Sequence, residues 1–165
     1  MVEPSRVHLE AQKREEENIR FRTFLKNRAD PSELDRQFFE LHNALFAEYD
    51  CCKCNNCCRE YSISLTKNDI KAIAAFLNLS EQEFSDKYGT KSFDGHTLTP
   101  PCCFLKENGA CAIQTCKPKK CLDFPYTDKP DRLLSLHSVL SFAEICPVVF
   151  EILERLKVMY GFRGR

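Results

Sequence analysis

The stretch Cys51-Cys52-Lys53-Cys54-Asn55-Asn56-Cys57-Cys58 contains five cysteines in eight residues. Two cysteines separated by two residues can direct their sulfurs at one ion within a tight turn, and thiolates are strongly donating ligands. Six more cysteines follow, at Cys102, Cys103, Cys111, Cys116, Cys121 and Cys146. The sequence therefore predicts a metal site built from sulfur.

Composition excludes several classes of protein. The 165 residues include 24 basic and 24 acidic ones, so no net charge attracts the chain to nucleic acid or to a membrane surface, and neither partner is expected. No run approaches the ~18 apolar residues that span a bilayer. Residues 1–20 are highly charged and do not resemble a secretory signal, so we expect a cytoplasmic protein with reduced thiols. For an exported chain, a disulfide framework would be the alternative.

The residues before the cysteine run favour helices. Residues 3–28 favour a helix and are highly charged, and we expect the first part of this segment to be a solvated or fraying helix. Asp30 suits an N-cap, Pro31 the first helical position and Glu33 the third, so an amphipathic helix is expected over 31–49. We interpret its aromatic face as core packing, and docking of a protein partner through this helix is the alternative.

Short elements are expected after the run. Residues 61–65 alternate as a strand does, and two capping pairs predict helices from Thr66 and from Ser80. Residues 90–101 are expected to contain one short strand. Asn108-Gly109 predicts a hairpin turn. We also expect a strand over 134–139 and a last helix that begins at Pro147 and ends at Gly161.

These elements predict an α+β fold: a small cysteine-rich, metal-centred domain with short strands and irregular loops, plus a helical N-terminal extension. The expected boundaries are 1–49 for the extension and 50–165 for the metal-binding domain. Metal ligation contributes on the order of 10 kcal/mol to such a site, which is comparable with the stability of a whole domain. Removal of the metal is therefore expected to unfold it.

Spacing alone allows two kinds of centre. Cys51, Cys54 and Cys57 form C-x2-C-x2-C and Cys146 precedes Pro147, as in ferredoxins that bind iron–sulfur clusters. Zinc sites more often use two separated C-x2-C pairs, and here only the first half has that form. The spacing favours an iron–sulfur cluster, and zinc is the alternative.

The motifs together resemble those of a known family. C-x2-C-x2-C-C is followed by Cys-x-Phe-Leu, Cys-x-Ile, Pro-x-x-Cys and a final Cys-Pro. This order resembles the CxxCxxCC cysteine-cluster family, also called YkgJ-like or zinc- or iron-chelating, and is similar to the cysteine region of flagellin lysine-N-methylases. The resemblance covers about residues 51–147. It implies eight metal ligands: Cys51, Cys54, Cys57, Cys58, Cys102, Cys111, Cys121 and Cys146.

The sequence departs from the family at a few positions. Asn55 stands where the family usually has glycine, and Lys117 where it favours arginine. Gln114 replaces a common aromatic residue, and Val148 a frequent glycine. No thiol of the expected set is lost.

Eight thiolates exceed the four that one zinc ion or one cubane cluster takes. Either two centres share them, or one centre binds four and the rest do not ligate. Adjacent residues such as Cys57 and Cys58 point apart in an extended chain, which favours two centres. Three further cysteines are expected to be buried apolar groups or bystanders: Cys52, Cys103 and Cys116.

The sequence gives weaker evidence for functional residues other than the cysteines. His96 and His137 could ligate or support a metal, although lone histidines are more often structural. The sequence has no Walker A loop and no dinucleotide or serine-hydrolase motif, and it identifies no catalytic residue. Three hypotheses follow: a metal- or cluster-binding protein, a redox or protein-modifying enzyme that uses the centre, and a protein-interaction module in which the metal only stabilises the fold.

Overall fold

The computed structural model describes residues 1–88, 90–92 and 95–163, and it divides the chain into two compact units. Met1–Asp50 and Pro125–Arg165 form one, called the helical unit below, and Cys51–Phe124 form the other, called the cysteine-rich unit. The division after residue 50 falls next to the expected boundary, while the C-terminal segment groups with the N-terminal one. Helices predominate, and a small antiparallel sheet confirms the α+β class.

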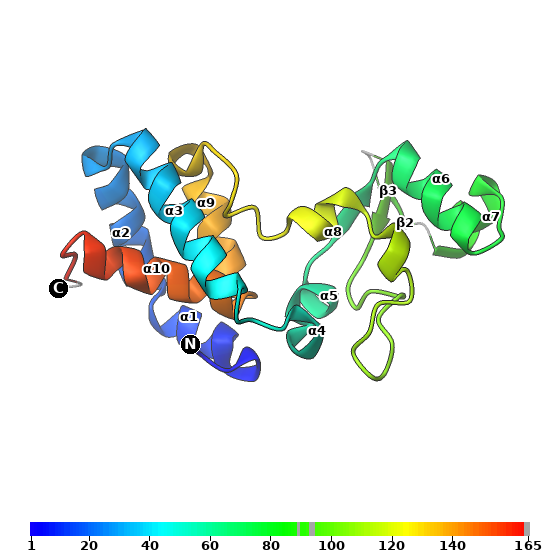
Figure 1. The fold of residues 1–165 in the computed structure, drawn as a ribbon, viewed down its shortest axis with the longest axis horizontal. Helices are drawn as coiled ribbons and strands as arrows, with labels where there is room; N and C mark the ends of the chain where they lie inside the picture. Colours follow the sequence, from blue (N-terminus) through cyan, green and yellow to red (C-terminus); the bar gives the residue numbers. More distant parts are fainter. Residues whose placement is uncertain (89, 93–94, 164–165) are drawn as a thin grey trace. The chain divides into compact units, whose positions relative to one another are not determined.

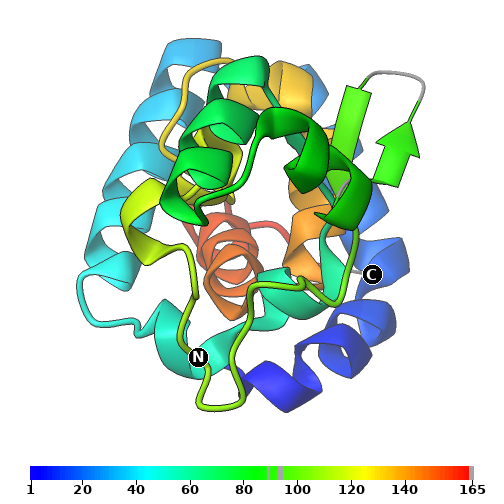
Figure 2. The same ribbon diagram turned by 90° about the vertical axis from the view of Figure 1, so that its right-hand side faces the viewer.

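The helical unit is built around its last helix (Figures 1 and 2). This unit contains α1 (Val7–Lys13), α2 (Glu15–Arg28), α3 (Pro31–Phe46), α9 (Arg132–Ala143) and α10 (Pro147–Met159), preceded by a 3-10 turn at Pro4–Arg6. Helix α10 contacts α1, α3 and α9. Because Val149, Ile152 and Leu156 are fully buried on it, α10 forms the centre of this unit's core.

The N-terminal segment is part of that core, so the expectation of a solvated or fraying helix in its first part was wrong. Val7, Ala11, Phe21 and Leu25 are at most 3% exposed. Their spacing places them on one side of α1 and α2, and the charged residues between them face water. The Phe21 ring lies 5.0 Å from that of Phe162, centroid to centroid. The segment was taken for a solvated one because its partner helices lie more than 100 residues further along the chain.

Helix α3 begins as expected. The Asp30 carboxylate accepts a 2.9 Å hydrogen bond from the Glu33 amide, and Pro31 occupies the first turn. The helix ends at Phe46, earlier than residue 49. Leu34 and Phe38 are fully buried, which confirms that this face packs in the core.

The strand expected over 134–139 was wrong, because this segment lies in α9. Leu136, Val139 and Ala143 are fully buried at helical spacing, while Leu134 is 83% exposed. The alternation of Leu134 and Leu136 therefore did not reflect a half-buried strand. The first amides of α9 are satisfied from α3, since the Asp35 carboxylate accepts hydrogen bonds from the amides of residues 131 and 132, at 2.9 and 2.8 Å.

The cysteine-rich unit combines one-turn helices with a three-stranded sheet of order β1-β3-β2. Its elements are α4 (Cys51–Cys54), α5 (Asn56–Glu60), β1 (Ile63–Leu65), α6 (Lys67–Phe76), α7 (Glu81–Tyr88), β2 (Thr90–Ser92), β3 (Gly95–Leu98), a 3-10 turn (Gln114–Cys116) and α8 (Lys119–Asp123). Strand β3 pairs antiparallel with β1, Leu98 opposite Ile63, and with β2 on its other side; Figure 2 shows β2 and β3 next to each other. Two strands thus replace the single one expected over 90–101.

Both predicted caps in this unit are confirmed. Thr66 and Asp69 form a reciprocal capping box at the start of α6. The Glu83 carboxylate accepts a 2.8 Å hydrogen bond from the Ser80 amide before α7. The two helices cover a hydrophobic core of nine buried residues: Ile63, Leu65, Ile70, Ile73, Ala74, Phe84, Leu98, Phe104 and Ile113.

The predicted hairpin is present, but its two arms share only one described β-bridge. Leu105 and Cys111 form one antiparallel bridge, and the Ala112 amide donates to the Phe104 carbonyl over 2.8 Å. Gly109 has φ +83° in the turn, as the motif requires. In the part of the chain that the structure describes, no helix has the length and apolar character needed to cross a membrane.

The core of the cysteine-rich unit should be needed for its stability. Phe84 is fully buried and lies 6.5 Å from the ring of Phe104. Phe84→Ala is expected to destabilise the unit by about 3–5 kcal/mol, because it removes a buried ring and leaves a cavity. The matched control is Leu122→Ala in the same unit, where 66% exposure predicts a change below about 0.5 kcal/mol. Urea unfolding measures both, and equal effects would contradict the described core.

Candidate metal centre

The structure places seven of the eight expected ligands in the cysteine-rich unit: Cys51, Cys54, Cys57, Cys58, Cys102, Cys111 and Cys121. The eighth, Cys146, belongs to the helical unit, where it is the N-cap residue of α10 and 7% exposed. That Cys146 shares a centre with the others stays a prediction. The geometry below therefore concerns the seven thiols of one unit.

The cysteine run is divided by one left-handed residue. Asn55, with φ 57° and ψ 9°, separates the one-turn helices α4 and α5. Its amide donates to the Cys51 carbonyl over 3.0 Å, and its carbonyl accepts from the Arg59 amide over 3.2 Å. A left-handed conformation is what a glycine tolerates best, and asparagine is among the few residues that adopt it readily. Asn55 thus fits the position that the family usually gives to glycine.

The last two cysteines of the run lie in a helix. Cys57 and Cys58 are both in α5, and the Cys57 thiol hydrogen-bonds to Cys58. Their side chains therefore do not follow the extended geometry from which two centres were inferred. The number of centres has to be argued from the surroundings of each thiol.

Backbone hydrogen bonds tie the second cysteine segment to the first. The Cys102 amide donates to the Cys58 carbonyl over 2.7 Å, and the Leu105 amide donates to the Cys102 carbonyl over 3.0 Å. Leu105 in turn pairs with Cys111. The cysteine run and the hairpin that contains Cys102 and Cys111, which are far apart in the sequence, thus meet at Cys58 and Cys102.

Four thiols form one electrostatic group, called the thiol quartet below: Cys58, Cys102, Cys111 and Cys121. Each of them lies within electrostatic range of the other three. All four are half-buried, and Cys102, Cys111 and Cys121 also pack against the hydrophobic core. Lys117 lies within range of three members of the quartet.

Two members of the quartet ionise easily. The hydrogen bond from Cys57 lowers the pKa of Cys58 to about 7, against the opposing effect of burial. The hydrogen bond between Cys102 and Cys103 lowers the pKa of Cys102 to about 6 and raises that of Cys103 far above its ordinary value. Both hydrogen bonds therefore favour the thiolate, the form that binds metals.

The other two members resist ionisation. Burial raises the pKa of Cys111, and it raises the pKa of Cys121 to about 12, with the neighbouring thiols acting in the same direction. The nearby Lys117 acts in the opposite direction on both thiols. A cation placed among the four sulfurs would favour the charged form of all of them.

The donor set fits zinc or iron. The quartet offers four sulfurs, which is the number of protein ligands that a structural zinc ion or a cubane cluster takes. None of the eleven cysteines, all of which lie in the described residues, is joined in a disulfide. Within those residues, no group of three or more His, Cys, Asp or Glu side chains is already close enough to hold a metal ion. The quartet is thus a set of neighbours that must draw together around a ligand.

The three cysteines outside the expected set differ in their surroundings. Cys116 lies within electrostatic range of Cys111, and Cys103 hydrogen-bonds to Cys102. Cys116 is half-buried against the core of its unit, whereas Cys52 and Cys103 are exposed. Sequence reasoning did not predict the influence of Cys103 on Cys102. The only signal of this pair in the sequence was the adjacency of the two cysteines.

The histidines contribute less. His96 lies in β3, and its buried Nε2 has no hydrogen-bond partner among the described residues. His137 lies in α9 of the helical unit. His42, on α3, lies 2.8 Å from the Thr127 hydroxyl through Nδ1, and burial lowers its pKa.

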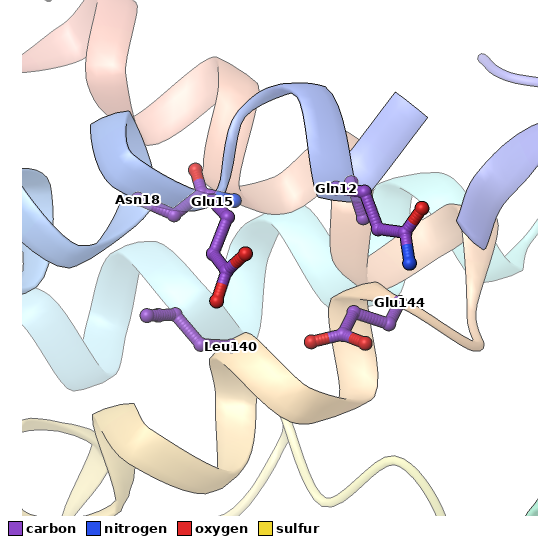
Figure 3. Close-up of a pocket in the computed structure, with 6 residues that line it drawn as sticks. Gln12, Glu15, Asn18, Leu140 and Glu144 are labelled. Carbon is purple, nitrogen blue, oxygen red and sulfur yellow. The ribbon is translucent and has the colours of Figure 1, made fainter. Parts of the chain in front are cut away.

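A cavity of about 210 Å³ lies in the helical unit, and none of the expected ligands is among its lining residues. Figure 3 shows Glu15 and Glu144 extending from α2 and from the end of α9 toward the same space. Its remaining lining residues are Ala11, Gln12, Asn18 and Leu140. The acidic and amide groups there lack the soft donors of the cysteine-rich unit.

The fold and its thiols define a cysteine-rich α+β protein with a sulfur donor set. The sequence profile of the CxxCxxCC family, described as "Putative zinc- or iron-chelating domain", matches residues 50–147. The chain therefore belongs to the CxxCxxCC family. No solved structure matches the chain.

Native alkylation should follow the exposure of the thiols. In the metal-free protein, iodoacetamide is expected to modify the exposed Cys51 and Cys52 well before the buried Cys54, because only accessible sulfurs meet the reagent. Peptide mass spectrometry over time measures the order. Denatured protein is the control, in which the three should react at similar rates. Equal rates in the native state would contradict the described packing of the run.

Proposed function

We propose that the protein binds zinc or iron through cysteine thiolates of its CxxCxxCC domain. The observation that carries the proposal is the thiol quartet, since Cys58, Cys102, Cys111 and Cys121 lie within electrostatic range of one another. Membership of a family described as zinc- or iron-chelating supports it. All four thiols are half-buried, and three of them, Cys102, Cys111 and Cys121, pack against the hydrophobic core, so water is partly excluded from the quartet.

The quartet supplies one complete centre in this proposal. Three further expected ligands of the same unit, Cys51, Cys54 and Cys57, are candidates for a second centre, and Cys146 stays a predicted ligand. Cys54 is buried, and Cys57 hydrogen-bonds to Cys58 of the quartet. Their C-x2-C spacing suits ligation of one ion or of a cluster.

Positive side chains support the charge of such a centre. Four thiolates around a divalent ion carry a net charge of about −2, which is costly in a half-buried site without compensation. Lys117 and Arg59 both lie within electrostatic range of Cys58 and favour its thiolate form. Lys117 thus takes the position at which the family favours another cation, arginine.

The choice between an iron–sulfur cluster and zinc follows from the spacing. C-x2-C-x2-C together with Cys146-Pro147 favours a cluster, and a single zinc ion on the quartet is the alternative. We also place the protein in the reducing cytoplasm. Thiolate ligation needs reduced sulfur, and the described cysteines form no disulfide.

Anaerobic purification followed by elemental analysis tests the proposal. A bound metal is expected in the wild type, and brown colour with acid-labile sulfide would identify a cluster, whereas colourless protein with zinc would identify the alternative. Cys121→Ser should lose at least one centre, because a hydroxyl is a poor substitute for a soft thiolate ligand. Cys116→Ser is the matched control, since Cys116 is also half-buried against the same core.

Metal content separates the outcomes. Retention of one centre in Cys146→Ser, together with its loss in Cys121→Ser, would support a quartet complete within the cysteine-rich unit. Wild-type protein that folds and contains no transition metal, even after reconstitution under reducing conditions, would refute the proposal. Equal metal loss in Cys116→Ser and Cys121→Ser would refute the assignment of the quartet.

A further inference from the structure

The turn before Cys111 lies directly against the cysteine run. A Cβ atom placed on Gly109 would lie 2.7 Å from the Asn55 side-chain nitrogen and 2.9 Å from the Cys52 carbonyl oxygen. Both distances are shorter than real Cβ contacts allow. No residue larger than glycine fits at position 109 without displacing the run, so the turn and the run are packed against each other at this point.

The Asn55 side chain occupies the centre of this contact. Asn55 is 6% exposed, and its Nδ2 donates a 2.7 Å hydrogen bond to the Cys52 carbonyl. The same nitrogen faces Gly109. The side-chain amide of Asn55 therefore closes the bend between α4 and α5 on one side and packs against the turn on the other.

Both segments lead from this contact to members of the quartet. The turn is held by hydrogen bonds from the Gly109 amide to the Lys106 carbonyl and from the Lys106 amide to the Ala110 carbonyl, each 2.9 Å long, and it continues into Cys111. The run continues into Cys58, whose carbonyl accepts the hydrogen bond from the Cys102 amide. A shift at Asn55 or Gly109 would thus change how the cysteines of the two segments approach each other.

We propose that Asn55 is a positioning residue of the metal centre. Its side-chain amide packs between the Cys52 carbonyl and Gly109, and it fixes the cysteine run against the 106–111 turn before metal binds. The proposal rests on the proposed function for its effect on metal affinity. Its structural part concerns the metal-free chain alone. Asn55 does not touch the metal in this account, and it acts through the placement of Cys58 and Cys111.

A simpler role for Asn55 would be to tolerate the left-handed backbone. Glycine tolerates φ 57° at least as well, so Asn55→Gly keeps the backbone conformation and removes only the side-chain contacts. A backbone role therefore predicts that Asn55→Gly has no effect, whereas a positioning role predicts weaker metal binding.

Four variants test the proposal: Asn55→Gly, Gly109→Ala, the two combined, and Gly161→Ala as a control. Gly161 also has positive φ, +59°, and nothing lies within 4 Å of its added Cβ. It therefore reports the strain of alanine in this backbone region without a close contact. Co²⁺ is the probe, because its absorption spectrum reports ligation by thiolates, and competition with a chelator gives its affinity.

Asn55→Gly and Gly109→Ala should each weaken Co²⁺ binding about tenfold, the factor that corresponds to the loss of one good hydrogen bond or contact. Gly161→Ala should leave the affinity unchanged. The double variant should lose less than the sum of the two single losses in free energy, because removal of the Asn55 side chain relieves the closest clash of the methyl group added at position 109. Circular dichroism verifies folding, and if Gly109→Ala fails to fold, Asn55→Gly carries the test because it introduces no clash.

Amide hydrogen exchange of the metal-free protein provides a second readout. The Cys102 amide, which donates to Cys58, should exchange faster in Asn55→Gly and Gly109→Ala than in the wild type and in Gly161→Ala. Wild-type protein that does not bind Co²⁺ but shows these exchange differences would refute the metal function and leave the contact standing. Unchanged exchange and unchanged affinity in Asn55→Gly, with metal bound by the wild type, would overturn the positioning role alone.

Discussion

Four half-buried thiols that lie within electrostatic range of one another cannot all ionise unless a cation binds among them. This electrostatic constraint governs the cysteine-rich unit. Cys58 and Cys102 gain thiolate character from hydrogen bonds with neighbouring thiols, while Cys111 and Cys121 are kept protonated by burial and by the negative charge that the first two develop. Lys117 offsets part of this repulsion. The arrangement is consistent with a protein that gathers sulfur in order to bind a cation.

The hydrophobic core of the same unit makes that gathering possible in structural terms. Phe84, Phe104 and Ile73 are buried in it, and α6, α7 and the sheet hold them. Apolar burial stabilises a chain in proportion to the area removed from water. The segments bearing Cys102, Cys111 and Cys121 pack on this core, so its burial opposes their thiol repulsion. In the proposed function, metal ligation and apolar burial therefore both stabilise this unit.

Local signals predicted the features that local interactions decide. The caps at Asp30, at Thr66 with Asp69 and at Ser80 with Glu83 join residues three apart, so they could be read directly from the sequence. The C-x2-C spacing and the resemblance to a family indicated the thiols in the same way. Helix α9 was missed because its first amides bond to Asp35, 97 residues away in the case of Arg132. The packing of the first helix was missed for the same reason, since Arg14 pairs with Glu154 across 140 residues.

Prediction of the candidate site from the sequence was limited in the same way. The resemblance to a family indicated Cys58 as a ligand, but the contact of Asn55 with Gly109 and the group formed by Cys58 and Cys121 depend on tertiary packing. Sequence alone also placed Cys57 and Cys58 in extended chain, whereas a hydrogen-bonded turn of helix carries them. Long-range packing is what a single sequence leaves undetermined.

The order of the two units along the chain has a consequence for synthesis on the ribosome. The helical unit is discontinuous, and its central helix α10 follows the cysteine-rich unit in the chain, whereas the cysteine-rich unit is continuous from Cys51 to Phe124. Domains tend to fold as units once their residues have emerged. The thiol quartet is thus fully translated while α1, α2 and α3 still lack α9, which contacts all three, and α10. Seven of the eight expected ligands can meet cellular metal on a nascent chain, and only Cys146 arrives with the closing of the helical unit.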